Sequence, residues 1–494
     1  MKALCWEGVN KLAVERVPDP RIQNAHDVIV KVRYTTSCGS DLHLLGGYIP
    51  AMEAGDVIGH EFMGEIVEIG PEVTKHQVGG RVVVVSFIGC GTCWYCDNNL
   101  WSLCDNTNTN PGIGQALWGY EPGGIFGFSH AMGGFMGSHA EYVRVPFADH
   151  GAFSVPEQVD DLSAVFASDG VPTGWMGADL GGVQAGDTVA VWGAGGVGQM
   201  TARAATLLGA AQVIVIDRLP ERLAMTAQHV GAETLDYSRT DVGAELRERT
   251  GGRGPDVCIE AVGQEAHTYG PEYLYDKVKQ QLRLENDRPI AIREAIMACR
   301  KGGSVFSLGV FAGLVDKFPL GALMNKGLTL RGAQQHGRYL PMLLDRMAEG
   351  EITTSHLATH ALSLDDGPHG YDIFKNKEDG CVRAVFQPRH PLNPGRRPNA
   401  CLRGQSRTPG PCERPIGCAP CSGSYSNYYR RSGTRSASSG RIAEDHPGKC
   451  RLSSGAGVIS FVAPVRCARA PVLGAHRRPA LRSPPAYGFW SPGA

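Results

Sequence analysis

The stretch Thr188-Val189-Ala190-Val191-Trp192-Gly193-Ala194-Gly195-Gly196-Val197-Gly198 decides the fold of this 494-residue chain. Its first half has the apolar character of a short buried strand, and a helix is expected directly after it, over residues 197–208. Between them stands a G-x-G-x-x-G sequence, which at a strand-to-helix junction is typical of a turn that places a dinucleotide's pyrophosphate on the helix N-terminus. A glycine turn of purely structural purpose is the alternative. The predicted cofactor contacts here are Gly193, Gly195, Gly196, Val197 and Gly198.

The next predicted strand, Gln212 to Asp217, ends in a carboxylate 19 residues past Gly198. A carboxylate in this position suits hydrogen bonds to the adenosine ribose hydroxyls and would repel a 2′-phosphate. We therefore predict that Asp217 favours NAD over NADP, while the neighbouring Arg218 keeps NADP open as the alternative.

From about residue 160 onwards, strands and helices alternate regularly. A helix is expected over 221–230, and further strands over 257–262 and 304–310. This alternation predicts an α/β fold, in which helices cover both faces of a doubly wound parallel sheet. A charged segment from Glu265 to Pro289 interrupts the pattern and is expected to be helical over 272–284.

The first 160 residues have a different pattern, with strand-like alternation over 27–34, 62–69 and 81–88. They predict a β-rich, barrel-like domain, in which residues 105–139 form an extended loop near a site. Near the other end, a helix over 341–349 and a closing strand over 382–386 are expected. The predicted division is a catalytic domain over 1–160, a cofactor domain over 161–312, a second catalytic part over 313–388 and a tail over 389–494.

Charge separates the tail from the rest of the chain. Residues 389–494 carry a net charge of +14 and residues 1–388 one of −15. The acidic body argues against nucleic acid as its main partner, and no apolar run is long enough for a membrane span or a signal peptide, so a cytoplasmic protein is expected. The Pro, Gly, Ser and Arg-rich tail is predicted to be non-globular or the product of a shifted reading frame. A further hypothesis is that this basic tail binds nucleic acid. Its Cys418-Ala419-Pro420-Cys421 sequence lacks the second cysteine pair that a zinc site needs.

The strongest single motif is a run of four cysteines, Cys90-x2-Cys93-x2-Cys96-x7-Cys104. Four thiolates satisfy a tetrahedral zinc ion completely, so such a site is structural. An iron-sulfur cluster is the competing interpretation, but a proline normally follows the last cysteine of such runs and Asp105 stands there instead.

A second cluster of polar residues lies between Cys38 and Glu61. Within 24 residues it contains Cys38-Gly39-Ser40-Asp41-Leu42-His43 and Gly59-His60-Glu61. Cys38 and His60 could supply two ligands of a catalytic zinc, which needs a third protein ligand and an open position. Either residue alone is more typical of a protein core.

Together these motifs resemble the zinc-dependent medium-chain alcohol dehydrogenases. The four-cysteine loop, the glycine turn and the Cys38–Glu61 region occur in that family's order, over residues 1 to about 387. Ser168-Asp169-Gly170-Val171-Pro172-Thr173-Gly174 and the insertion after Glu265 resemble the branch that contains glutathione-independent formaldehyde dehydrogenase. The resemblance implies a GroES-like catalytic domain beside a Rossmann cofactor domain, with two zinc ions per chain and NAD.

The resemblance also implies the roles of single residues. Asp169 would join Cys38 and His60 as the third ligand of the catalytic zinc, with Glu61 beside the metal and Asp41 on the far nitrogen of His60. Zinc would act as a Lewis acid on the substrate oxygen, and Ser40 would pass the alcohol proton towards His43 at the surface. The remaining implied cofactor contacts are Thr173, Gly309 and Val310 at the nicotinamide and Arg222 at the adenosine ribose or phosphate.

The substrate is expected to be a primary or secondary alcohol or a hydrated aldehyde, formaldehyde included. A polyol or amino-alcohol dehydrogenase and a catalytically silent binding relative are the alternatives.

Gly39 stands where some family members have a pyrophosphate-binding arginine, so that contact must come from elsewhere. The resemblance also implies a homo-oligomer, dimer or tetramer, formed through the edge of the cofactor-domain sheet, and it raises the hypothesis that NAD is retained and recycled by dismutation. Candidate substrate-lining residues are Trp118, Phe126, Trp175 and His336.

Overall fold

The computed structural model describes residues 1–388 except 267–287, 312, 314 and 335. The helix predicted over 272–284 and the entire tail, with its Cys418–Cys421 pair, lie outside the described residues. All elements below belong to one compact unit.

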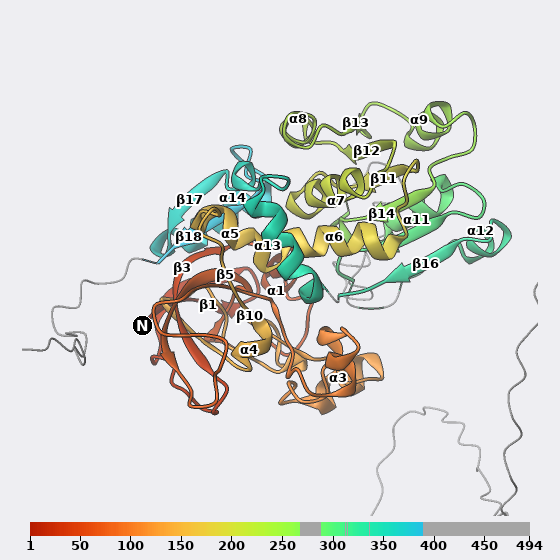
Figure 1. Cartoon of the computed structure of the whole chain (residues 1–494). Helices are drawn as coiled ribbons and strands as arrows, with labels where there is room; N and C mark the ends of the chain where they lie inside the picture. Colours follow the sequence, from red (N-terminus) through yellow and green to blue (C-terminus); the bar gives the residue numbers. More distant parts are fainter. Residues whose placement is uncertain (267–287, 312, 314, 335, 389–494) are drawn as a thin grey trace, which may run out of the picture. The chain divides into compact units, whose positions relative to one another are not determined.

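A six-stranded parallel sheet forms one half of this unit (Figure 1). Its strand order is β13-β12-β11-β14-β15-β16, so the chain starts in the middle at β11 and winds first to one edge and then to the other. The predicted doubly wound parallel sheet is confirmed. The strands are β11 (Thr188–Trp192), β12 (Gln212–Asp217), β13 (Glu233–Asp236), β14 (Val257–Glu260), β15 (Ser304–Ser307) and β16 (Thr329–Gly332).

Both faces of this sheet are buried because alternate residues of each strand point to opposite sides. Val189 and Val191 pack with helices on one face, and Ala190 and Trp192 pack with helices on the other. Continuous apolar strands are therefore required, which explains the uninterrupted run before Gly193. The first face is covered by α6 (Gly170–Gly181), α7 (Gly196–Leu207) and α8 (Pro220–His229), and the second by α9 (Val242–Arg249) and α11 (Ile290–Ala298).

The parallel sheet does not end at residue 312, where the predicted cofactor domain ends. Its edge strand β16 pairs with β15 from Thr329 to Gly332, after the short helix α12 (Leu320–Asn325). A division that follows the sheets would therefore fall after Gly332. The division into domains remains a prediction.

The β-rich half is built mainly around β3 (Val28–Thr36), which pairs antiparallel with β5 (Glu61–Ile69), β9 (Tyr142–Val145) and β18 (Ala384–Gln387). Because β18 comes from the far end of the described chain, residues before and after the parallel sheet share one β-sheet. The other strands are β1 (Lys2–Gly8), β2 (Lys11–Arg16), β4 (Asp56–Val57), β6 (Arg81–Val84), β7 (Phe87–Ile88), β8 (Gly124–Ile125), β10 (Ala152–Ser154) and β17 (His360–Ser363). The helices are α1 (Gly39–Leu45), α2 (Trp94–Asp97), α3 (Pro111–Trp118), α4 (Ala148–Gly151), α5 (Asp161–Ala164), α13 (Leu340–Ala348) and α14 (Gly367–Asn376).

Two local predictions in this half need correction. The strand expected over 81–88 is two strands, because β6 pairs with β5 whereas β7 leaves that sheet to pair with β8. The segment 105–139 is not a plain loop. It contains the helix α3 and the strand β8. Pro111 lies in the first turn of α3, where proline favours the start of a helix, and the hydrophobic periodicity of the segment did not indicate this start.

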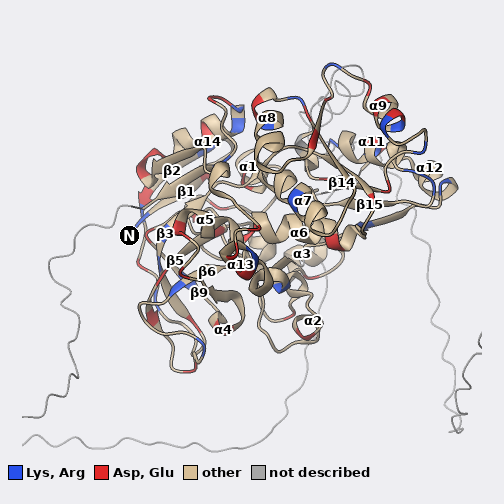
Figure 2. Cartoon of the chain, turned by 45° about the horizontal axis from the view of Figure 1, so that its top comes forward, with Lys and Arg blue, Asp and Glu red and all other residues tan. Residues whose placement is uncertain are grey.

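Figure 2 shows Lys and Arg as well as Asp and Glu along the outer loops and helices of the described residues. Among the described residues, no helix is both long and apolar enough to cross a membrane.

Candidate active site and metal centres

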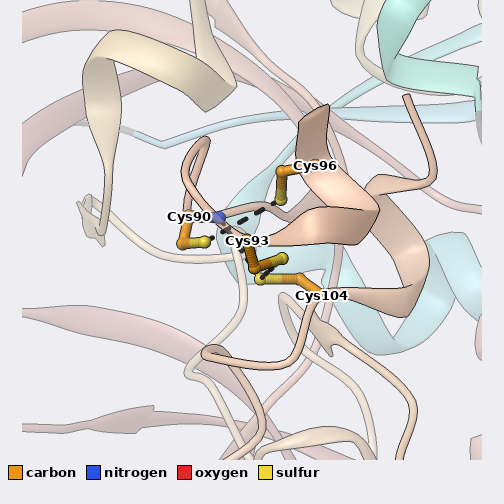
Figure 3. Close-up of side chains that lie close together, drawn as sticks. All are labelled: Cys90, Cys93, Cys96 and Cys104. Carbon is orange, nitrogen blue, oxygen red and sulfur yellow. Dashed lines mark hydrogen bonds between the residues drawn. The ribbon is translucent and has the colours of Figure 1, made fainter. Parts of the chain in front are cut away.

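The four predicted cysteine ligands converge on one point around α2 (Figure 3). The Sγ atoms of Cys90 and Cys96 lie 3.9 Å apart, and those of Cys93 and Cys104 lie 3.8 Å apart. Sulfurs at about 2.3 Å from a tetrahedral zinc would be separated by about 3.8 Å, so the donor set fits the ion. The sequence spacing allows this because the short helix α2 returns Cys96 towards Cys93.

Neighbouring groups favour the thiolate form of Cys104 in particular. A hydrogen bond with Cys96 lowers the pKa of Cys104 to about 4. The backbone N–H groups of Cys90 and Asn106 point at Cys104 Sγ, at 3.4 and 3.5 Å. Such donors stabilise negative charge on sulfur.

Cys38, His60 and Glu61 form a second, buried group of possible metal ligands, with their ligand atoms all within 4.8 Å of one another. Cys38 is the N-cap residue of α1, and Asp41 Oδ2 accepts a hydrogen bond from its backbone N–H at 2.8 Å. His60 directly precedes β5. The capped start of α1 and the start of β5 hold the thiol and the imidazole against each other.

Asp41 also orients His60. Its Oδ1 lies 3.1 Å from His60 Nδ1, as the family resemblance implied, and this leaves Nε2 to face Cys38 and Ser40. Tyr371 on α14 donates its hydroxyl to Asp41 Oδ2 at 2.6 Å. Burial by itself would raise the pKa of Asp41, but His60 outweighs burial and lowers it to about 2. A charged carboxylate behind the ring favours the tautomer whose Nε2 can bind a metal.

Asp169 lies next to this group, with its Oδ2 4.0 Å from His60 Nε2. It comes just before α6, the long helix of the other half. Its oxygens accept hydrogen bonds from Ser86 at 2.7 Å and from Thr173 at 2.6 Å. His336, which the sequence singled out only as a substrate contact, lies 4.0 Å from the same Oδ2. Asp169 as the third zinc ligand remains a prediction.

Arg383 is a site residue that the sequence analysis missed. It is 3% exposed, and its Nη1 lies 2.8 Å from Glu61 Oε1 and also bonds the Ser37 carbonyl. Burial raises the pKa of Glu61 to about 7, although Arg383 acts in the opposite direction. No local pattern marks Arg383, because it precedes an ordinary closing strand, 322 residues from its partner.

Ser40 and His43 lie on α1. Ser40 Oγ is 3.2 Å from both Cys38 Sγ and His60 Nε2, so it borders the ligand group. The expectation that His43 lies at the surface is wrong, since it is 3% exposed. The last five residues of α1, from Asp41 to Leu45, are all buried, and His43 borders a cavity instead.

The glycine turn after β11 is built for a close approach of backbone to backbone. Gly193 has φ +100°, and a Cβ at Gly198 would lie 1.8 Å from the Gly193 carbonyl oxygen. Only glycine fits these two positions. Asp217 accepts a hydrogen bond from the Ala194 N–H at 2.8 Å, which ties the end of β12 to the turn. One cavity is lined by most of the predicted contacts at this end, Gly193, Gly195, Gly196, Val197, Asp217 and Arg222. Gly198, also predicted as a contact, is not among the residues that line it.

A second cavity, of about 300 Å³, lies on the other side of Gly39 and Val197. It is bordered by the predicted metal-site residues Cys38, Ser40, His43, His60 and Asp169, and also by Thr173, Gly309 and Val310. Of the four substrate candidates, Trp118 and His336 line this cavity, whereas Phe126 and Trp175 are packed in hydrophobic cores.

The chain has clear relatives among known proteins. The family description "Alcohol dehydrogenase GroES-like domain" matches residues 24–157, and "Zinc-binding dehydrogenase" matches residues 196–276. A zinc-type alcohol dehydrogenase-like protein of Bacillus subtilis is 38% identical over 393 residues, covering 78% of this chain and 100% of the relative. A glutathione-independent formaldehyde dehydrogenase of Pseudomonas aeruginosa is 32% identical over 401 residues, covering 76% and 94%.

Among solved structures, an alcohol dehydrogenase from Thermus sp. ATN1 matches with a TM-score of 0.65 and 32% identity, covering 79% of this chain and 100% of that one. The fold and the relatives define the class as a zinc-dependent oxidoreductase. This chain belongs to the zinc-containing medium-chain alcohol dehydrogenase family.

Proposed function

We propose that this protein transfers hydride between NAD and an alcohol, or a hydrated aldehyde, at a zinc ion held by Cys38, His60 and Asp169. The observation that supports this most is that a single cavity is lined both by these ligand residues and by Thr173 and Gly309, which would face the nicotinamide. When bound, zinc supplies Lewis-acid polarisation of the substrate oxygen, and NAD accepts or returns the hydride.

The protein's own part in this reaction is to move a proton and to orient the substrate. Ser40 Oγ borders the ligand group, so it is placed to accept the proton of a substrate hydroxyl. His43, on the same helix and on the same cavity, is the next basic group. Because His43 is buried, the proposed relay leads to a ring on the cavity wall and not directly to solvent.

Arg383 is the proposed replacement for the pyrophosphate contact that Gly39 does not provide. It lines the cofactor cavity, and its Nε would be 2.9 Å from a Cβ placed on Gly196. A guanidinium this close to the glycine turn suits a diphosphate. Arg383 then joins Glu61, beside the proposed zinc, to the cofactor.

The walls of the substrate cavity favour an alcohol with an apolar body. Ile49, Phe87, Ile125 and Phe128 form one hydrophobic cluster and all border the cavity. A polyol would leave most of its hydroxyl groups unpaired against such walls, and each unpaired buried hydroxyl costs about 1–3 kcal/mol. Formaldehyde would leave much of the cavity unfilled. It is the alternative substrate, because one relative, from Pseudomonas aeruginosa, is a glutathione-independent formaldehyde dehydrogenase.

We also propose a homo-oligomer formed through the edge of the parallel sheet. All four residues of β16 are exposed, and Leu320 and Met324 on the adjacent α12 are 63% and 69% exposed. An uncovered edge strand beside apolar side chains is a surface that soluble proteins normally cover.

One experiment tests the proposed function and its alternatives. Purified protein would be assayed with NAD and a series of ethanol, hexanol, benzyl alcohol, sorbitol and formaldehyde, and its bound nucleotide and zinc would be measured. The proposal expects NAD-dependent oxidation of alcohols, with the best substrates among the larger apolar ones. Turnover of formaldehyde by protein that keeps its own NAD would support the dismutation hypothesis instead, and no turnover of any substrate by zinc-loaded protein would indicate a silent relative.

A further inference from the structure

The cofactor cavity extends well beyond the residues that would hold the pyrophosphate and the ribose. The same cavity includes a pocket of mainly apolar residues, which come from the ends of β11 and β12, from α11 and from nearby loops. Because the cavity is continuous, a dinucleotide whose ribose lies at Asp217 must place its base in this pocket. The pocket residues are Trp192, Ile216, Leu219, Tyr237, Val262, Ala266, Ile290, Ala291 and Glu294.

Glu294 is the acidic side chain among these pocket residues. It lies on α11, is partly buried, and its Oε2 accepts a hydrogen bond from Trp192 Nε1 at 3.0 Å. Trp192 is the last residue of β11 and is 3% exposed, so its indole is held by the core. A rigid donor therefore orients the carboxylate of Glu294 at the wall of the pocket.

In the described part of the chain, no ion pair involves Glu294. Two of the basic residues that line the cavity lie at the glycine turn. Arg222 approaches Gly195 and Arg383 approaches Gly196, both in the glycine turn. A carboxylate beside a base pocket can accept hydrogen bonds from an amino group and cannot donate any.

We propose that Glu294 recognises the base of the cofactor by accepting a hydrogen bond from the exocyclic 6-amino group of adenine. This inference rests on the proposed use of NAD and extends it to the choice of base. A 6-oxo purine such as hypoxanthine presents a carbonyl oxygen at the same position. Two acceptors would then face each other in a partly buried pocket, which costs affinity because neither is paired.

The test compares NADH with its hypoxanthine analogue, reduced nicotinamide hypoxanthine dinucleotide. Dissociation constants would be measured on nucleotide-free, zinc-loaded protein by isothermal titration calorimetry, so that the result does not depend on turnover. We expect NADH to bind at least about tenfold more tightly than the analogue. In Glu294→Gln the ratio should fall below about threefold, because an amide can accept from the amine or donate to the carbonyl.

Two further variants make the comparison specific. Glu248→Gln, on the exposed side of the neighbouring helix α9, should keep the ratio of the unmodified protein. Trp192→Phe removes the donor that orients the carboxylate, so it should lower the ratio, but less than Glu294→Gln does. A ratio near one in the unmodified protein, or an unchanged ratio in Glu294→Gln, would overturn the inference while leaving the proposed function in place. Failure of both dinucleotides to bind zinc-loaded protein would overturn the proposed cofactor, and the inference with it.

Discussion

Arg383 Nη1 lies 2.8 Å from Glu61 Oε1, in an ion pair whose side chains are 4% and 0% exposed. Glu61 directly follows His60 in the sequence, and Arg383 approaches the glycine turn at Gly196. Buried ion pairs add little net stability when complete, but removing one partner leaves an uncompensated charge. The Arg383–Glu61 ion pair therefore belongs both to the proposed metal site and to the proposed diphosphate site.

Replacing Arg383 by methionine should therefore weaken both stability and cofactor binding. The buried Glu61 loses its cation, which costs about 3–5 kcal/mol when a buried pair is broken. Differential scanning calorimetry should show a lower unfolding temperature, and titration with NADH should show at least about tenfold weaker binding. The double variant Arg383→Met with Glu61→Gln is the matched control. It should recover stability but not NADH affinity, and a double variant no more stable than Arg383→Met would contradict the role given to the pair.

The two proposed zinc sites should be separable by mutation. Cys38→Ala and Asp169→Ala should each reduce the zinc content from two ions per chain to one, because the four-cysteine site around α2 shares no ligand with them. Native mass spectrometry would count the ions. Asp169→Asn is an informative partner, since an amide keeps the acceptor for Thr173 but is a poorer ligand for zinc. Retention of two zinc ions by Asp169→Ala would show that Glu61, and not Asp169, completes the catalytic site.

Asp217 should determine the choice between NAD and NADP. Its carboxylate would repel a 2′-phosphate, so Asp217→Ala should reduce the preference for NADH over NADPH by at least about tenfold. The variant should also lose some stability, because Asp217 accepts hydrogen bonds from the backbone of Ala194, Arg218 and Leu219. Dissociation constants for NADH and NADPH measure the effect. Glu221→Gln, an exposed change at the start of α8, should leave the preference unaltered.

His356 should make the protein less stable in mild acid. Burial, together with the stacked ring of His229 at a centroid distance of 4.4 Å, lowers the pKa of His356 to about 4, below the ordinary histidine value of 6.5. Between these two values the unfolded chain binds a proton that the folded chain does not, so the contribution of His356 to stability falls as pH drops from 6.5 to 4. His356→Gln should therefore lose less stability than the unmodified protein between pH 7.5 and pH 5. Thermal unfolding at both pH values measures this, and equal losses would contradict it.

The parts of the fold that were predictable from the sequence are those in which local pattern and tertiary environment agree. The strands around Gly193 are apolar throughout because helices cover both faces of the sheet, and a continuous apolar run shows this directly. Prediction failed where pairing partners decided the structure. Residues 81–88 have one strand-like pattern, yet β6 and β7 pair with different strands, and no local feature of the run marks the break.

The candidate site divides in the same way. The sequence by itself determined the four-cysteine loop, the glycine turn and the Cys38–Glu61 cluster, because each lies within one short segment whose spacing carries the chemistry. Only the tertiary structure decided that Arg383 pairs with Glu61, that His336 approaches Asp169, that His43 is buried and that Glu294 faces Trp192. The three pairs join residues 102 to 322 positions apart, and the burial of His43 depends on what packs against α1. Long-range contacts of this kind depend on how sheets and helices pack, which the residues on either side of each partner do not encode.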